Sequence, residues 1–259
     1  MPKPQVSLYA LDDFPLVEPG ADLASLIAAS LKRNDFVLQT GDVLVLAQKI
    51  VSKAEDCYVR LNEVTVSPEA EQLAREADKD PRIAELILRE SRLVMRVRKG
   101  AVIVRHRGGW VQAHAGIDQS NITSDSDDPR VLLLPEDPDA SAAALRERLK
   151  EHCGVEVAVL IADSAGRPWR NGITNFAIGA AGFATLDNRI GHNDLFGRPL
   201  QVTELGIGDE LAAAAGLLMG QADEARPVVV IRGVGLSPPD EPDRGAKALL
   251  RPPHMDLFQ

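Results

Sequence analysis

Apolar residues recur along this chain in two kinds of pattern, which predict alternating strands and helices. Short continuous apolar runs predict strands at residues 6–10, 43–52, 131–134, 155–163 and 227–231. Apolar residues at helical spacing predict helices at residues 22–32, 140–153 and 209–219. Strands that alternate with helices indicate a mixed α/β architecture, in which helices cover a largely buried sheet.

Capping and turn residues predict two further helices and a hairpin. Ser67 and Asp80 each precede a proline, so each predicts a helix with a capping side chain and proline at its first position. Lys99-Gly100 predicts the turn of a hairpin over residues 94–104. Gly154 predicts the end of the helix before it.

Three segments lack a clear period. Residues 123–130 are polar and turn-rich, and the tail from Ser237 is rich in proline. Residues 164–208 are rich in Gly and Asn, which favours a loop region of the kind that often carries ligands. Since no internal repeat or long linker divides the chain, we expect residues 1–259 to form a single catalytic unit with two lobes.

Charge and composition narrow the class of protein. The chain has 29 Lys and Arg against 38 Asp and Glu, a net charge of −9 that argues against nucleic acid as a partner. The basic stretch at residues 89–107 is interpreted as a solvated strand face. Cys57 and Cys153 have no paired spacing, and no apolar segment resembles a signal peptide or a membrane span. We therefore expect a soluble cytoplasmic protein without a disulfide framework.

Familiar catalytic motifs are missing from the sequence. It contains no phosphate-binding G-x-x-x-x-G-K-[ST] loop, no G-x-G-x-x-G after a strand and no G-x-S-x-G elbow. Its five histidines have no zinc-binding spacing. The chemistry must therefore come from a less common arrangement.

Two carboxylates stand out by position. Asp163 directly follows an apolar strand, where α/β sheets present ligand-binding groups, and Asp118 lies in the polar turn AGIDQSN. Carboxylates in such places suit a hard divalent cation. On spacing alone, however, each is more typical of a capping or turn residue.

Two clusters of cationic residues can receive anions. Arg167 and Arg170 flank Trp169 in GRPWRN, and guanidinium groups bind phosphates and carboxylates with two parallel hydrogen bonds. The alternative is a surface loop pinned by a buried Trp169. Lys49 and Lys53 would share one face of the predicted strand, which suggests phosphate contacts unless the strand ends near Ile50.

Taken together, these segments closely resemble the coenzyme F420-0:L-glutamate ligases, which are gamma-glutamyl ligases of a deazaflavin coenzyme. The matching segments follow the family's order over nearly the whole chain. They are residues 41–55, 115–121, 163–182 and 202–233 and the terminal LLRPP.

The resemblance implies a distinctive α/β fold, the F420-0:gamma-glutamyl ligase-like fold, in an intertwined homodimer. It implies a GTP-dependent ligase that uses Mg²⁺ or Mn²⁺ together with K⁺. Such an enzyme would phosphorylate the terminal carboxylate of the coenzyme precursor, and the amine of L-glutamate would then displace the phosphate. An acyl phosphate needs no protein nucleophile, which fits the missing serine or cysteine elbow.

The resemblance also implies roles for individual residues. Metal ligands would be Asp118, Asp163, Ser164 and Gln221. The nucleotide would contact Phe14, Pro15, Leu16, Val17, Gln48, Lys49, Lys53, Asn121, Met219, Gly220, Gln221, Ala222, Asp223 and Glu224. Because two anions must react, catalysis would also use the positive charges of Lys53, Arg167 and Arg170.

The chain departs from the family pattern at a few positions. Ser164 replaces the usual Thr, His114 replaces Asn, and Gly172-Ile173-Thr174-Asn175 replaces G-Q-T-D. Because Ile173 and Asn175 follow the arginine cluster, we expect them to alter acceptor choice more than GTP binding. Two alternatives are a related ligase with a different carboxylate acceptor and a catalytically idle nucleotide-binding protein.

Overall fold

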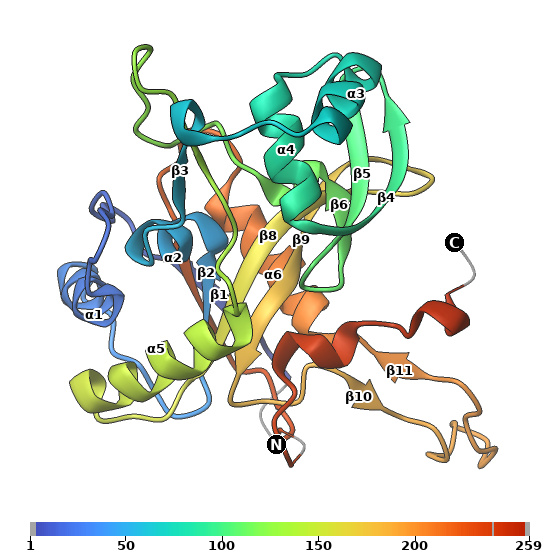
Figure 1. The fold of residues 1–259 in the computed structure, drawn as a ribbon. Coiled ribbons are helices and arrows are strands. Elements are labelled where there is room, and N and C mark those ends of the chain that lie inside the picture. The colour runs from blue at the N-terminus through green and yellow to red at the C-terminus, as the bar shows by residue number, and fades with distance from the viewer. Residues whose placement is uncertain (1–3, 240, 257–259) are drawn as a thin grey trace.

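The computed structural model describes residues 4–239 and 241–256, and it is built around a five-stranded sheet (Figure 1). In spatial order the strands are β1 (Ser7–Ala10), β12 (Val228–Arg232), β2 (Val43–Ala47), β8 (Ala158–Arg167) and β9 (Arg170–Ala181). Neighbouring strands are antiparallel except for β2 and β8, which run parallel.

Both faces of this sheet are buried, which explains the continuous apolar runs in its strands. In β2, Leu44 and Leu46 face one core, whereas Val43 and Val45 face the other. The first core includes residues of α1 (Leu23–Arg33) and α5 (Pro138–Cys153). The second includes residues of α6 (Ile207–Met219). The mixed α/β architecture predicted from the sequence is confirmed.

Helix ends form where the sequence predicts them. The side chain of Asp22 accepts a hydrogen bond from the backbone of α1. Ser67 and Asp80 likewise cap α3 (Pro68–Ala77) and α4 (Pro81–Arg89). Gly154 ends α5 with a φ of 69°, a left-handed conformation that glycine adopts without strain.

A second region packs beside the central sheet, at the upper right of Figure 1. Helices α3 and α4 share a separate apolar core with β4 (Ser91–Arg98) and β5 (Ala101–His106), and β6 (Val111–Ala113) completes this three-stranded sheet. The hairpin turns at Lys99-Gly100, as predicted. Arg92, Arg96 and Arg98 of the basic stretch are exposed, which confirms that it is a solvated strand face.

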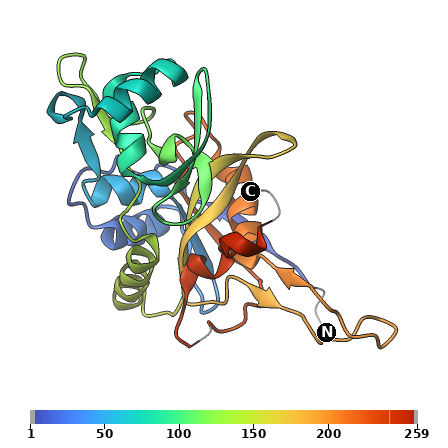
Figure 2. The same ribbon diagram turned by 45° about the vertical axis from the view of Figure 1, so that its right-hand side comes forward.

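The remaining elements are short. They are β3 (Tyr58–Arg60), β7 (Arg130–Leu132), β10 (Asp187–Asn188), β11 (Glu204–Leu205) and the 3-10 helices η1 (Leu61–Glu63), η2 (His114–Gly116), η3 (Gly245–Leu249) and η4 (Pro253–Met255). Strands β10 and β11 begin an arm that projects away from the body of the molecule (Figure 2). No helix in the described residues has the length and apolar character needed to cross a membrane.

Two expectations from the sequence are wrong. The strand predicted at residues 43–52 ends at Ala47, where the chain leaves the sheet and forms α2 (Gln48–Ala54). Lys49 and Lys53 therefore share a face through the i, i+4 spacing of a helix rather than through strand alternation.

Residues 164–208 are the second error, because they do not form a loop throughout. Strand β8 continues to Arg167 and pairs with the twelve-residue β9. The outer half of this hairpin buries little side-chain surface, which accounts for its Gly- and Asn-rich composition.

Candidate active site

A cavity of about 540 Å³ lies where β2 ends, beside the middle of β8. Because the two strands run parallel and β8 continues beyond β2, the chain that follows β2 leaves this edge of the sheet beside residues 163–164 of β8. Ala47 pairs with Ala162, so Gln48 and Asp163 come directly after neighbouring positions. Every residue predicted to contact the nucleotide lines this cavity, together with Asp163 and Ser164.

Asp118 is held at this edge by two consecutive residues of α2. The Nζ atom of Lys49 lies 3.0 Å from Asp118 Oδ1, and the amide of Gln48 donates to Asp118 Oδ2. The hydroxyl of Ser52, one helical turn on, donates to Gln48 Oε1 at 2.8 Å and fixes that amide. Burial raises the pKa of Asp118, although the charge of Lys49 opposes this shift. The contacts with Lys49 and Gln48 thus orient the Asp118 carboxylate, while its partial removal from water disfavours the ionised form.

Asp163 is the more perturbed of the two acids. Burial, followed by the nearby charge of Asp118, raises its pKa to about 7. Its Oδ1 atom accepts a hydrogen bond of 2.7 Å from the backbone of Ser164. Two carboxylates that repel one another across a buried space are characteristic of functional sites and of cation-binding sites.

The donor atoms here fit a hard cation. Within residues 4–239 and 241–256, no group of three or more His, Cys, Asp or Glu side chains is gathered for metal binding. The oxygen donors that the resemblance implies are Asp118, Asp163, Ser164 and Gln221; the last three line the cavity, whereas Asp118 contacts α2 beside it. An oxygen-only set of this kind suits Mg²⁺ or Mn²⁺, which commonly keep waters or substrate phosphates as further ligands.

Lys53 tethers the loop that follows Asp118. Its Nζ atom donates to the carbonyl oxygen of Asn121 at 2.7 Å, and the Asn121 amide donates to the carbonyl of Ala222 at 2.9 Å. Burial and the charge of Lys49 lower the pKa of Lys53. Three segments distant in sequence are therefore linked through Asn121 on the cavity wall.

Asn175 lies inside this cavity, away from the arginine cluster that precedes it in sequence. Its Oδ1 atom accepts a hydrogen bond of 2.8 Å from the amide of Gln221, and its own amide faces the sulfur of Met219 at 3.7 Å. This contact leaves the amide oxygen of Gln221 available to a cation. Ile173 is exposed and does not line the cavity. The segment that departs from the family pattern therefore has one residue, Asn175, inside the cavity and another, Ile173, exposed outside it.

Arg167 and Arg170 form the last register pair of the β8–β9 hairpin, at its exposed tip. Neither lines the cavity, and their catalytic role stays a prediction. Trp169 between them is 90% exposed, so the alternative in which a buried tryptophan pins this loop is wrong. Figure 2 shows the hairpin extending beyond the body of the molecule.

Comparison with known proteins places this arrangement in a family. The family model described as F420-0:Gamma-glutamyl ligase matches residues 13–233, which include the whole cavity wall. The chain belongs to the F420-0:gamma-glutamyl ligase family.

The similarity of this gamma-glutamyl ligase family member to curated relatives extends over almost the full chain. A coenzyme F420:L-glutamate ligase from Methanopyrus kandleri is 47% identical over 94% of this chain and 93% of its own length. The protein of the same name from Methanothermobacter thermautotrophicus is 44% identical, covering 98% of this chain and 99% of its own. Another from Methanocaldococcus jannaschii is 38% identical over 92% and 90%.

Some residues around the site of this gamma-glutamyl ligase family member were not predicted. Ile122, Thr123 and the segment from Ala225 to Pro227 line the cavity. These residues directly follow Asn121 and Glu224 in the sequence, and this adjacency could have predicted them. Gln112 contacts Asp163 from β6, and no sequence motif marks it.

Proposed function

We propose that this chain is a ligase that joins L-glutamate to the terminal carboxylate of coenzyme F420-0, at the expense of GTP. The observation that carries the proposal is the similarity, over almost the full chain, to curated coenzyme F420:L-glutamate ligases, with the family model spanning the cavity. The cavity volume of about 540 Å³ is in the range typical of small-molecule sites. We also propose that residues 1–259 act as one catalytic unit in the cytoplasm.

The first chemical step would be phosphoryl transfer. The γ-phosphoryl group would move from GTP to a carboxylate oxygen of the acceptor, forming an acyl phosphate and releasing GDP. Both reactants are anions, so the barrier depends on positioned positive charge. Lys49 and Lys53 stand one helical turn apart on the cavity wall and would offset charge on the triphosphate.

The second step would form the amide bond. The amine of L-glutamate would attack the acyl carbon, inorganic phosphate would leave, and the nitrogen would lose a proton. No covalent bond to the protein forms in either step, so the residues need only hold and orient the reactants.

Asp118, Asp163, Ser164 and Gln221 would hold Mg²⁺ or Mn²⁺, with K⁺ as a further cation. Such ions neutralise phosphate charge when they are bound. The protein's own contribution would be to hold the two carboxylates and one amide oxygen in fixed orientations. Contacts of Lys49 and Gln48 with Asp118, and of Asn175 with Gln221, support this role.

A single reaction mixture tests the proposal. Purified protein would be incubated with GTP, Mn²⁺ or Mg²⁺, K⁺, L-glutamate and F420-0, and both phosphate release and the glutamylated product would be measured. We expect product and phosphate in equal amounts, each dependent on acceptor and glutamate. GTP binding without phosphate release would instead indicate an idle nucleotide-binding protein. Turnover with another carboxylate but not with F420-0 would indicate a related ligase.

Lys53→Ala is expected to raise the KM for GTP and to lower kcat. A hydrogen bond to a charged group contributes about 1.5–3 kcal/mol, so kcat/KM for GTP should fall roughly 10- to 100-fold. Steady-state kinetics with varied GTP measures this loss. Lys99→Ala is the matched control, because Lys99 is exposed on the β4–β5 turn beside Asp78. A change in thermal stability alone would mean that Lys53 only tethers Asn121.

The two parts of the altered segment should have separable effects. Asn175→Asp places a charge beside Gln221, so we expect it to change the affinity for Mn²⁺ and the KM for GTP. Ile173 lies outside the cavity. Ile173→Gln should therefore leave the KM for GTP unchanged and alter kcat/KM for F420-0. Parallel kinetics of the two single variants measure this difference. If both variants shift the same parameter, the segment acts as one unit.

We further propose that the protein is a homodimer. Large apolar side chains are exposed on the two projecting ribbons, Trp169 and Ile173 on the hairpin and Leu195 and Phe196 on the β10–β11 arm. Clustered exposed apolar residues commonly mark protein interfaces. Sedimentation equilibrium should therefore give twice the 27.9 kDa chain mass at micromolar protein. A stable monomer with full ligase activity would contradict this proposal.

A further inference from the structure

Gln112 is buried in the middle of β6, although Val111 and Ala113 on either side of it are exposed. A buried glutamine must satisfy one carbonyl and two N–H groups, or its burial is costly. The contacts of its amide therefore show what this side chain does.

The hydrogen-bond donors around Gln112 fix the orientation of its amide. The indole Nε1–H of Trp110 and the backbone N–H of Gly116 both point at one end, at 3.2 Å and 2.9 Å. Only an oxygen can accept from both, so this end is Oε1. The amide nitrogen then lies at the other end and donates to Asp163 Oδ2 at 3.1 Å.

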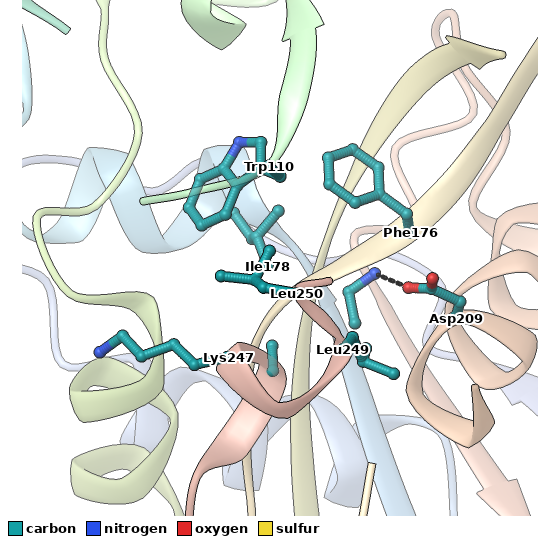
Figure 3. A pocket seen from close by; sticks show the side chains of 9 residues that line it. Trp110, Phe176, Ile178, Asp209, Lys247, Leu249 and Leu250 are labelled. Atoms are coloured by element: carbon teal, nitrogen blue, oxygen red, sulfur yellow. Dashed lines mark hydrogen bonds between the residues drawn. The ribbon is translucent and has the colours of Figure 1, made fainter. Parts of the chain in front are cut away.

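Each of these donors is itself held in place. Trp110 is buried and stacks on His106, with ring centroids 4.8 Å apart and an angle of 13° between the rings. Its six-membered ring lines a second, smaller cavity of about 150 Å³, and Figure 3 shows the indole nitrogen directed away from that cavity. The donor therefore faces Gln112, and His106 packs flat against the indole ring.

Gly116 is the other fixed donor. Its φ is +69°, and a Cβ atom there would lie 2.2 Å from the oxygen end of the Gln112 amide. His114 and Ala115 before it also have φ near +55°, a conformation that is costly for residues other than glycine. Three consecutive left-handed residues thus bring the backbone against this amide, two residues before Asp118.

We propose that Gln112 is a positioning residue that fixes the rotation of the Asp163 carboxylate for cation binding. One N–H from Ser164 and one from Gln112 engage the two carboxylate oxygens, so the remaining lone pairs have a defined direction. Residues behind a metal ligand commonly orient it in this way. This inference rests on the proposed function, because it takes Asp163 as a ligand of Mg²⁺ or Mn²⁺.

The test measures Mn²⁺ binding directly, by titration calorimetry of full-length protein without nucleotide. Gln112→Met keeps the side-chain length and removes the donor, and we expect its Mn²⁺ affinity to fall roughly 10- to 100-fold. Trp110→Phe keeps the aromatic stack and removes only one of the donors that orient the amide. It should give a smaller loss in the same direction, and it serves as the test if Gln112→Met does not fold.

Ile87→Val is the matched control for a purely structural effect. Ile87 is fully buried in the core of α3, α4 and β5, so the variant should lower the melting temperature without changing Mn²⁺ affinity. Parental Mn²⁺ affinity in the folded Gln112 and Trp110 variants would overturn the inference, as would a parent protein that binds no Mn²⁺. The ligase assay of the parent protein is independent of this result, so failure of the proposed function is recognised separately.

Discussion

Asp163→Asn is expected to abolish ligase turnover while the protein stays folded. The substitution keeps the shape of the side chain and its contact with Ser164, but it removes the charge that a divalent cation would need. Loss of one preorganised electrostatic group at a reacting centre typically reduces kcat about 10²- to 10³-fold, and loss of a metal ligand should reach the upper end. Coupled measurement of phosphate release and product formation would detect the loss.

The same substitution should not destabilise the cation-free protein. The pKa of Asp163 is raised to about 7 by burial and by Asp118, so its ionised form is unfavourable without a cation. A neutral amide removes this repulsion but turns an NH2 group toward the amide nitrogen of Gln112, so the two effects oppose each other and the melting temperature should change little. Asp209→Asn is the control, because Asp209 is another acid whose pKa is raised by burial, yet it lines only the smaller cavity. Full activity of the Asp163→Asn variant would contradict the proposal that Asp163 is a metal ligand.

Gly179→Ala is expected to give a large loss of stability. A Cβ atom at this position of β9 would lie 2.3 Å from the carbonyl oxygen of Pro138, the first residue of α5. Because the obstacle is backbone, either the helix or the strand must shift. We expect the free energy of unfolding to fall by about 2–3 kcal/mol, the upper part of the range for overpacked cores. For a protein of this size the melting temperature would drop roughly 5–10 °C.

Gly166→Ala is the matched control on the neighbouring strand. A Cβ atom there meets nothing within 4 Å, so the free energy of unfolding should change by less than about 0.5 kcal/mol. Chemical denaturation of both variants measures the difference. Equal stability of the two would mean that α5 can move away from β9 at little cost.

Much of the fold could be predicted because local rules determine it. Ser67-Pro68, Asp80-Pro81 and Gly154 act through hydrogen bonds within a few residues, and each marks a helix end in the structure. The buried run before Asp163 likewise predicted a central strand. In such places the sequence alone contains the physical cause.

Other features depend on contacts between distant segments. Periodicity does not distinguish a ten-residue buried strand from a five-residue strand followed by a short helix, so the start of α2 at Gln48 was missed. The length of β9 is set by its pairing with β8 and not by its own Gly- and Asn-rich composition. The family resemblance predicted the cavity residues. The contact of Gln112 with Asp163 joins two strands distant in sequence, so only the structure revealed it.

The parallel pairing of β2 with β8 also determines when the site can form during synthesis. Val43 pairs with Ala158, so this ladder closes a loop of more than a hundred residues, and such long-range pairings form late. The cavity wall further requires residues 219–227, which precede β12, the strand that joins β2 from its other side. A ribosome-bound chain that ends before residue 219 thus contains Asp118 and Asp163 but lacks part of the cavity wall. Substrate binding can therefore stabilise only a chain whose synthesis is nearly complete.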